Sequence, residues 1–176
     1  DIREVLISKE AIEAKTKELA ERISRDYKGK DLLVVGVLKG SVIFASELIK
    51  NITIPCEIDF MAVSSYGSSS ETTGVVRILK DLDSEISRKH ILIVEDIVDS
   101  GVTLSYLLNY LKTRNASSVE IASLLTKPSR RKVDIDCKYV GFETPDEFLV
   151  GYGLDYAEKY RNLPFIGILK REVYEK

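Results

Sequence analysis

The segment ILIVEDIVDSGVTLSYLL, residues 91–108, restricts the fold of this chain more than any other stretch. Its apolar start predicts a short buried strand, and the leucines of 103–111 recur at helical spacing. A strand that runs directly into a helix is typical of an open α/β sheet, where ligands collect at the carboxyl ends of the strands. The loop between these two elements is therefore the first candidate for a functional site.

This loop combines groups suited to phosphate with two adjacent carboxylates. Four of its residues lead into the predicted helix, namely Asp99, Ser100, Gly101 and Thr103. Backbone N–H groups, two hydroxyls and the positive end of the helix dipole converge there, which suits a phosphate monoester. Glu95 and Asp96 would repel a phosphate unless they contact sugar hydroxyls or hold Mg²⁺. A ligand that consists of a phosphorylated ribose with a metal-bound pyrophosphate fits this combination of groups. The alternative, a turn that only caps the helix, explains the hydroxyls but not the paired acids.

The motif VEDIVDSGVT, residues 94–103, resembles the phosphoribosyl-pyrophosphate (PRPP) loop of the type I phosphoribosyltransferases. The family pattern is apolar residues, two acids, two apolar residues and then D-[ST]-G-x-T, and Ser100 keeps the hydroxyl where many members have Thr. The resemblance implies that Glu95 and Asp96 bind ribose hydroxyls and metal. It also implies a cradle for PRPP and its 5′-phosphate, formed by Ile97, Asp99, Ser100, Gly101 and Thr103.

Apolar patterns elsewhere in the chain fit the same architecture. Residues 12–27 have the spacing of an amphipathic helix, and 42–49 predicts a second one. Buried strands are expected at 32–38 and 119–125, and further strands at 58–63 and 148–150. A chain of 176 residues suits one domain with a substantial core. We expect a single α/β domain over 1–176, with a doubly wound, mainly parallel core sheet flanked by helices, and a small hood formed by the terminal segments.

The charge balance argues against binding of polyanions. The chain has 26 basic and 28 acidic residues, a net charge of −2, so it lacks the overall electrostatic footprint of a nucleic-acid-binding protein. It contains no apolar run near the roughly 18 residues of a membrane span and no leader of charged, apolar and small residues. We therefore expect a cytoplasmic protein that binds neither membranes nor nucleic acid.

Cysteine and histidine usage limits the chemistry further. Cys56 and Cys137 are far apart and form no CxxC pattern, which favours structural thiols over a zinc site or a disulfide framework. His90 is the only histidine and precedes the predicted strand at Ile91, where the start of a strand is the simpler interpretation. Any metal must therefore be held by oxygen ligands.

Two further loops carry a resemblance to the same family. The sequence LKGS places Lys39 and Gly40 at another junction between a strand and a helix. In the purine-using members this Lys-Gly peptide contacts pyrophosphate through its backbone and can be cis, whereas the start of a helix is the simpler interpretation. The polar segment 64–74 begins with SSYG, including Ser65 and Tyr66, and resembles the lid that shields the reaction from water. An ordinary hairpin connection is the alternative.

The last third of the chain carries residues expected to bind the base. Lys127 follows SLLT and matches the family lysine that reads the 6-oxo group of a purine, although a lysine at a strand end is usually solvated. The basic run 129–132 is expected to be a solvated turn. In VGFETPDEFLVGYGLDYAEKYRNLPFIGIL, residues 140–169, the resemblance implies that Phe148 stacks on the base and Leu149 contacts it through the main chain. It further implies that Asp155 helps to bind the base and metal, and that Arg161 binds pyrophosphate with Lys39 and Gly40.

The resemblance, which covers nearly the whole chain, implies transfer of the phosphoribosyl group from PRPP to N9 of hypoxanthine or guanine. The products are the nucleoside monophosphate and pyrophosphate, and Mg²⁺ offsets the charge of the leaving group. Asp99 is the expected catalytic residue, which takes the purine N7 proton or stabilises it by a hydrogen bond. The ranking of hypoxanthine, guanine and xanthine stays open at this stage, as does the choice between a homo-dimer and a homo-tetramer.

Two other functions stay open. An RNA-binding regulator on the same fold would need a concentrated basic face, which the near-neutral charge disfavours. A nucleotide sensor is compatible with an enzyme, because the PRPP site of some bacterial relatives also accepts the alarmone (p)ppGpp.

Overall fold

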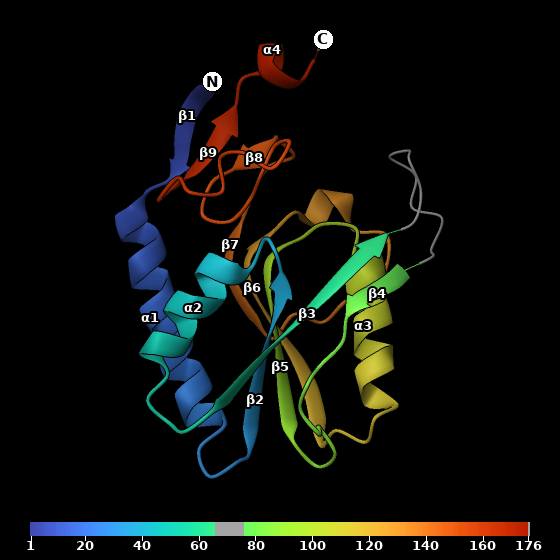
Figure 1. Cartoon of the computed structure of the whole chain (residues 1–176). Coiled ribbons are helices and arrows are strands. Elements are labelled where there is room, and N and C mark those ends of the chain that lie inside the picture. Colours follow the sequence, from blue (N-terminus) through green and yellow to red (C-terminus); the bar gives the residue numbers. More distant parts are fainter. Residues whose placement is uncertain (66–75, 176) are drawn as a thin grey trace.

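The computed structural model describes residues 1–65 and 76–175, which form two sheets and the helices packed around them (Figure 1). The larger sheet has the strand order β4-β3-β2-β5-β6-β7, and the smaller has the order β1-β9-β8. In Figure 1 the small sheet lies above the carboxyl ends of the core strands, and both chain termini lie beside it.

The core sheet is mainly parallel, as predicted. Its strands are β2 (Leu32–Leu38), β3 (Glu57–Ser65), β4 (Val76–Lys80), β5 (His90–Val98), β6 (Ser118–Thr126) and β7 (Tyr139–Glu143). Strands β3, β2, β5, β6 and β7 are parallel neighbours, and β4 runs antiparallel to β3. The carboxyl ends of β2, β5 and β6 therefore meet at one edge, which brings the two loops after β2 and β5 together.

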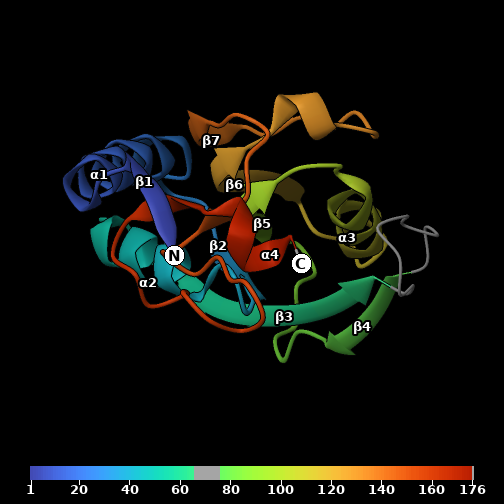
Figure 2. The ribbon, with the colours of Figure 1, turned by 90° about the horizontal axis from the view of Figure 1, so that it is seen from above.

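Helices cover both faces of this sheet, so the fold is doubly wound (Figure 2). Helices α1 (Lys9–Asp26) and α2 (Val42–Asn51) lie on one face, and α3 (Val102–Lys112) lies on the other. Leu92 and Val94 of β5 pack toward α1 and α2, whereas Ile91 and Ile93 pack toward α3. Burial on both faces explains why β5 begins with an unbroken apolar run rather than an alternating one.

The small sheet joins the two ends of the chain. Strand β1 (Ile2–Ile7) pairs antiparallel with β9 (Ile166–Leu169), which pairs antiparallel with β8 (Leu149–Val150). Only a helix was predicted in the first 27 residues, and β1 was not, because its partner strand lies at the other end of the chain. A short helix, α4 (Arg171–Tyr174), follows β9.

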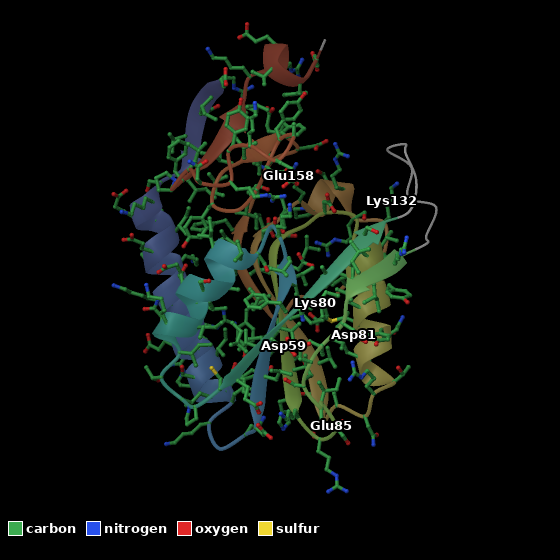
Figure 3. All side chains as sticks on the ribbon, in the orientation of Figure 1. Asp59, Lys80, Asp81, Glu85, Lys132 and Glu158 are labelled. Carbon is green, nitrogen blue, oxygen red and sulfur yellow. The ribbon has the colours of Figure 1, made fainter. Side chains whose placement is uncertain are left out.

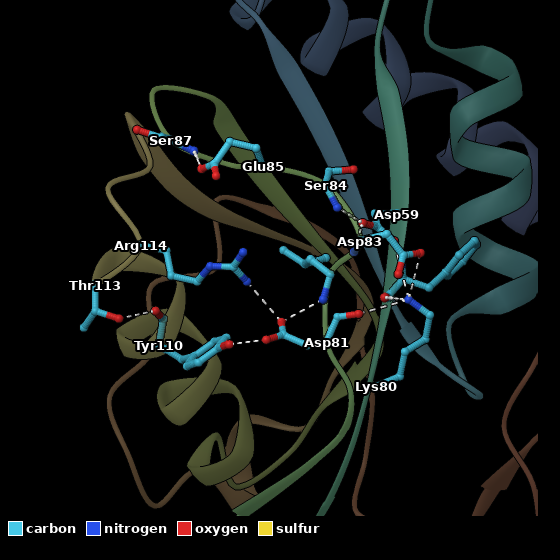
Figure 4. A network of polar contacts seen from close by, with 12 residues as sticks. Asp59, Lys80, Asp81, Asp83, Ser84, Glu85, Ser87, Tyr110, Thr113 and Arg114 are labelled. Atoms are coloured by element: carbon cyan, nitrogen blue, oxygen red, sulfur yellow. Dashed lines mark hydrogen bonds and ion pairs between the residues drawn. The ribbon is translucent and has the colours of Figure 1, made fainter.

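Two aspartates hold the connection between β4 and β5 (Figure 4). The buried carboxylate of Asp59 accepts hydrogen bonds from the backbone N–H groups of Asp83 and Ser84, at 2.8 and 3.1 Å. Asp81 accepts hydrogen bonds from Tyr110 of α3 and from Arg114, which follows that helix. The connection that follows β4 is thereby tied to both β3 and α3.

The thiols and the histidine lie away from the strand edge that carries the acids. Cys56 and Cys137 are both free, as expected, and burial raises the pKa of Cys137 to about 11. His90 lies at the amino end of β5, where its Nδ1 is 2.7 Å from Oγ of Ser118. It therefore stands at the opposite end of the strand from Glu95.

Candidate active site

The paired acids lie inside β5 rather than after it. The strand continues to Val98, and Glu95 pairs with Ser123 of β6 while Ile97 pairs with Leu125. The sequence pattern placed the acids at the carboxyl end of the strand, in the loop that leads to the helix, because carboxylates interrupt the apolar run. The sheet therefore fixes the backbone of Glu95 and Asp96.

Glycine is required where the loop after β5 enters α3. Gly101 is the N-cap residue of α3 and has a φ of +83°, in the left-handed region that side chains rarely adopt. A Cβ atom at this position would also meet Cγ1 of Ile135 at 2.9 Å. Asp99 is exposed just before it, and one of its carboxylate oxygens accepts a hydrogen bond from Ser100 N–H at 2.7 Å.

The basic run after β6 holds this loop in place. Arg131 donates from Nε to the carbonyl of Asp99 at 3.1 Å and from Nη2 to Oγ1 of Thr126 at 2.8 Å. The prediction of a solvated turn at 129–132 was wrong for Arg131. Its guanidinium finds fixed acceptors because the end of β6 lies beside the loop, a proximity that the sequence does not contain.

The acids have raised pKa values. Burial is the main cause for both, and the charge of Asp96 adds to it for Glu95. Burial raises the pKa of Asp96 to about 6, although the N–H of Ile97 and the charge of Arg161 oppose the shift. Burial disfavours the ionised forms of these two carboxyl groups, and a bound cation or hydroxyl donors would stabilise those forms.

The loop after β2 packs directly against Asp96. A Cβ atom at Gly40 would lie 2.0 Å from Oδ2 of Asp96, so only glycine fits between the two loops. A cis peptide bond joins Leu38 and Lys39. The cis bond considered for Lys39-Gly40 thus lies one residue earlier, and Lys39 extends outward to Glu158, with 2.8 Å between Nζ and Oε2.

A hairpin after β8 brings Arg161 to the same place. A Cβ atom at Gly153 would lie 2.1 Å from the carbonyl oxygen of Gly40, so the hairpin touches the loop after β2. Arg161 donates from Nη1 to the carbonyl of Gly153 at 2.6 Å and from Nη2 to Glu158 at 3.1 Å. Its Nε is buried and has no hydrogen-bond partner among the described residues. Figure 3 labels Glu158 between the small sheet and the core sheet.

A cavity of about 390 Å³ lies between the carboxyl ends of the core strands and the small sheet. Six predicted site residues line it, namely Ile97, Asp99, Lys127, Phe148, Leu149 and Asp155. Lys127 is half-buried and donates from Nζ to the carbonyl of Glu147 at 2.7 Å. Burial lowers the pKa of this lysine.

A second cavity of about 200 Å³ adjoins the first. Six predicted site residues of the PRPP-like motif line it, namely Glu95, Ile97, Asp99, Ser100, Gly101 and Thr103. Ile97 and Asp99 line both cavities. The structure therefore joins two compartments, with Ile97 and Asp99 at their junction.

Some predicted residues are not brought together in this way. Among the described residues no three His, Cys, Asp or Glu side chains gather closely enough to hold a metal, so Glu95, Asp96 and Asp155 do not form one carboxylate centre. The carboxylate of Asp155 instead accepts a hydrogen bond from the backbone N–H of Glu158 at 2.9 Å and forms an ion pair with Arg161. Of the two lid residues, Ser65 is the last residue of β3, and Tyr66 lies outside the described residues.

The larger cavity is also lined by residues that were not predicted from the sequence. Leu154, Arg171 and Tyr174 line it together with the predicted residues. Leu154 lies within the family-like segment 140–169, next to Asp155, so its proximity to the site could have been predicted from the sequence. The two residues of α4 carry no such signal, because a four-residue helix is too short to show a periodic pattern.

The phosphate loop, the paired acids and the doubly wound sheet together define a transferase that uses a phosphorylated, pyrophosphate-bearing ribose. Residues 5–157 match the phosphoribosyl transferase domain, and the chain belongs to this family. The family resemblance drawn from the sequence and the predicted fold are therefore confirmed.

Several proteins of this family are similar to the chain over nearly its whole length. The hypoxanthine-guanine phosphoribosyltransferase of Bacillus subtilis (strain 168) is 55% identical over 175 residues, covering 99% of this chain and 97% of the relative. A crystal structure of a hypoxanthine phosphoribosyltransferase from Staphylococcus aureus has a TM-score of 0.98 at 54% identity and covers 100% of this chain and 96% of that one. A hypoxanthine-guanine phosphoribosyltransferase from Bacillus anthracis, with a HEPES molecule in its active site, has a TM-score of 0.93 at 50% identity, covering 97% and 100%.

None of the helices that the structure describes is long and apolar enough to cross a membrane.

Proposed function

We propose that the chain transfers the 5-phosphoribosyl group of PRPP to N9 of hypoxanthine or guanine, giving the nucleoside monophosphate and pyrophosphate. The junction of the two cavities at Asp99 and Ile97 carries this proposal, because the ribose must connect a 5′-phosphate to a flat base. The relatives named for hypoxanthine and guanine support the choice of bases.

In this proposal the smaller cavity takes the 5′-phosphate. Its lining supplies the hydroxyls of Ser100 and Thr103 and the N-terminus of α3, an arrangement that suits an anion. Glu95 and Asp96 accept the hydroxyl groups of the ribose. Their raised pKa values support this role, since a hydroxyl donor or a cation would stabilise the ionised forms.

The donor set fits Mg²⁺ only in part. Carboxylate oxygens are suitable ligands, and Glu95 and Asp96 supply them, but the remaining positions would have to be filled by water and phosphate oxygens. Asp155 would join them only after leaving Arg161. When bound, Mg²⁺ offsets the negative charge of the pyrophosphate leaving group.

Pyrophosphate binds, we propose, where the loop after β2 meets the hairpin after β8. Arg161 lies there with a buried, unpartnered Nε, a donor that a phosphate oxygen could satisfy. Lys39 and Gly40 supply backbone groups, and glycine lets the pyrophosphate approach the main chain closely.

The larger cavity takes the purine, which stacks on Phe148, meets Leu149 through the main chain and is bordered by Asp155. Lys127 donates a hydrogen bond to the 6-oxo group of the purine. The 6-amino group of adenine would leave the ammonium of Lys127 without an acceptor. Asp99 is exposed at the junction and accepts the N7 proton, or a hydrogen bond from it, as N9 bonds to the ribose.

The small sheet β1-β9-β8 is, in this proposal, the hood that covers the base. A lid containing Ser65 and Tyr66, a cytoplasmic location, a homo-dimer or homo-tetramer and binding of (p)ppGpp stay predictions. The RNA-binding alternative is not favoured, because the relatives are named as transferases of this reaction.

The test is PRPP-dependent nucleotide formation with hypoxanthine, guanine, xanthine and adenine, measured on the unmodified protein and on Asp99→Asn. We expect turnover of hypoxanthine and guanine but not adenine. Asp99→Asn should slow the transfer by about 10²- to 10⁴-fold, the usual range for general acid–base help, with PRPP binding retained. Asp136→Asn, in an exposed loop, is the matched control. Unchanged turnover in Asp99→Asn would remove this aspartate from the mechanism.

A further inference from the structure

An aromatic cluster surrounds the residue proposed to stack on the base. The ring of Tyr174 is stacked on Phe148, with 4.7 Å between ring centroids and 29° between ring planes. The ring of Tyr156 meets Phe148 edge-on, at 5.6 Å and 78°. Phe148 and Tyr174 both line the larger cavity.

The backbone holds α4 next to Phe148. Leu169 N–H donates to the carbonyl of Phe148 at 2.8 Å, and Lys170 N–H donates to the carbonyl of Asp1 at 2.8 Å. Tyr174 follows Lys170 by only four residues, so the pairing of β9 in the small sheet brings this part of the chain close to Phe148.

A stacked ring offers a purine only one face. Tyr174 covers one face of Phe148, and Tyr156 meets the ring from the side, so a base can stack only on the other face. Ile97 lines the same cavity from the edge of the core sheet. A purine on the free face of Phe148 would thus form one layer of a stack that Tyr174 closes from the other side.

We propose that Tyr174 is a positioning residue for the purine: it holds the Phe148 ring in the orientation that stacks on the base. This inference rests on the proposed function, in which Phe148 binds the base. Tyr174 itself touches Phe148 and acts on the base through it, so its removal affects base affinity rather than the chemical step.

The first experiment compares steady-state constants of Tyr174→Ala and Tyr174→Phe. Stacked aromatic pairs contribute enough to change an affinity by about two- to tenfold. We expect Tyr174→Ala to raise KM for hypoxanthine by this factor, while kcat and KM for PRPP stay near those of the unmodified protein. Tyr174→Phe should restore KM, because it keeps the ring. Glu172→Ala, an exposed residue of the same helix, is the matched control.

Two outcomes of this comparison would overturn the inference. A lower KM for hypoxanthine in Tyr174→Ala would mean that the tyrosine occupies the place of the base. An unchanged KM in Tyr174→Ala, measured on protein whose far-ultraviolet circular dichroism matches that of the unmodified chain, would mean that the stack does not matter. If Tyr174→Ala does not fold, the same KM comparison is made with Tyr174→Leu, whose side chain fills space but has no ring to stack on Phe148.

A double-mutant cycle with Phe148→Ala separates this inference from the proposed function. If Tyr174 acts through Phe148, Tyr174→Ala should cause no further rise in KM when Phe148 is already Ala. Independent, additive effects would overturn the positioning role. An unchanged KM in Phe148→Ala alone would show that the proposed base site is wrong. A raised KM in Phe148→Ala together with an unchanged one in Tyr174→Ala would refute the inference about Tyr174 only.

Discussion

Replacement of Lys127 by Met tests how the base is read. Methionine keeps most of the length of the side chain and removes the ammonium, which in the proposed complex donates to the 6-oxo group of the purine. In the free protein this ammonium donates to the carbonyl of Glu147 at 2.7 Å. The substitution therefore removes a contact with substrate and one internal hydrogen bond, and the two effects have to be separated.

The internal effect should be small. Glu147 lines the cavity, so water can reach its carbonyl when the ammonium is absent. We expect a cost in unfolding free energy of about 1 kcal/mol, which corresponds to a fall in Tm of about 2 to 4 °C for a chain of this length. Such a protein would be fully folded under assay conditions.

The effect on the reaction should be larger. A hydrogen bond to a charged group contributes about 1.5 to 3 kcal/mol, so kcat/KM for hypoxanthine should fall by about 10- to 100-fold. KM for PRPP should stay near its original value, because Lys127 lines only the larger cavity of the two. Adenine should stay unreactive with the unmodified protein, since its amine places a donor opposite the ammonium.

The assay is initial-rate kinetics with hypoxanthine, guanine and adenine at saturating PRPP, accompanied by thermal unfolding. Lys132→Met is the matched control, because Lys132 is an exposed lysine of the neighbouring turn (Figure 3). Unchanged hypoxanthine kinetics in Lys127→Met would refute the reasoning, as would efficient use of adenine by the unmodified protein.

Two further predictions concern the framework of the site. Burial alone would raise the pKa of Asp59, but hydrogen bonds from three backbone N–H groups and the charge of Lys80 outweigh it and hold the pKa below its usual value. Asp59→Asn should therefore lower the unfolding free energy by about 1 to 3 kcal/mol at pH 7. The deficit should be complete above the unfolded-state pKa of about 4 and should shrink as the pH falls from there through the lower folded-state pKa. Urea unfolding at pH 7 and pH 3.5 checks this, with exposed Asp83→Asn as control. A deficit that is equally large at both pH values would contradict the prediction. Gly153→Ala should weaken pyrophosphate binding measured by calorimetry, because its Cβ would collide with the carbonyl of Gly40. Gly29→Ala is the control, since it also has a positive φ but open space around it, and equal affinities in the two variants would contradict the expectation.

Local patterns in the sequence determined most of the elements around the site. The helices near 12–27, 42–49 and 103–111 were predictable because each buries a face whose period is visible over several residues, and the strand at 32–38 was predictable from its unbroken apolar run. The PRPP-like loop was predictable because its acids, hydroxyls and glycine are contiguous, so their chemistry could be combined without knowledge of the fold.

The tertiary structure alone decided which distant residues meet. Strand β1 exists because β9, more than 150 residues later, supplies its hydrogen-bond partners. The contact of Gly40 with Asp96 and the stacking of Tyr174 on Phe148 likewise join segments with no common pattern. Spacing in a sequence reports only the periodic burial of a single element, whereas these contacts depend on how sheets and hairpins pack, and that packing is a property of the whole chain.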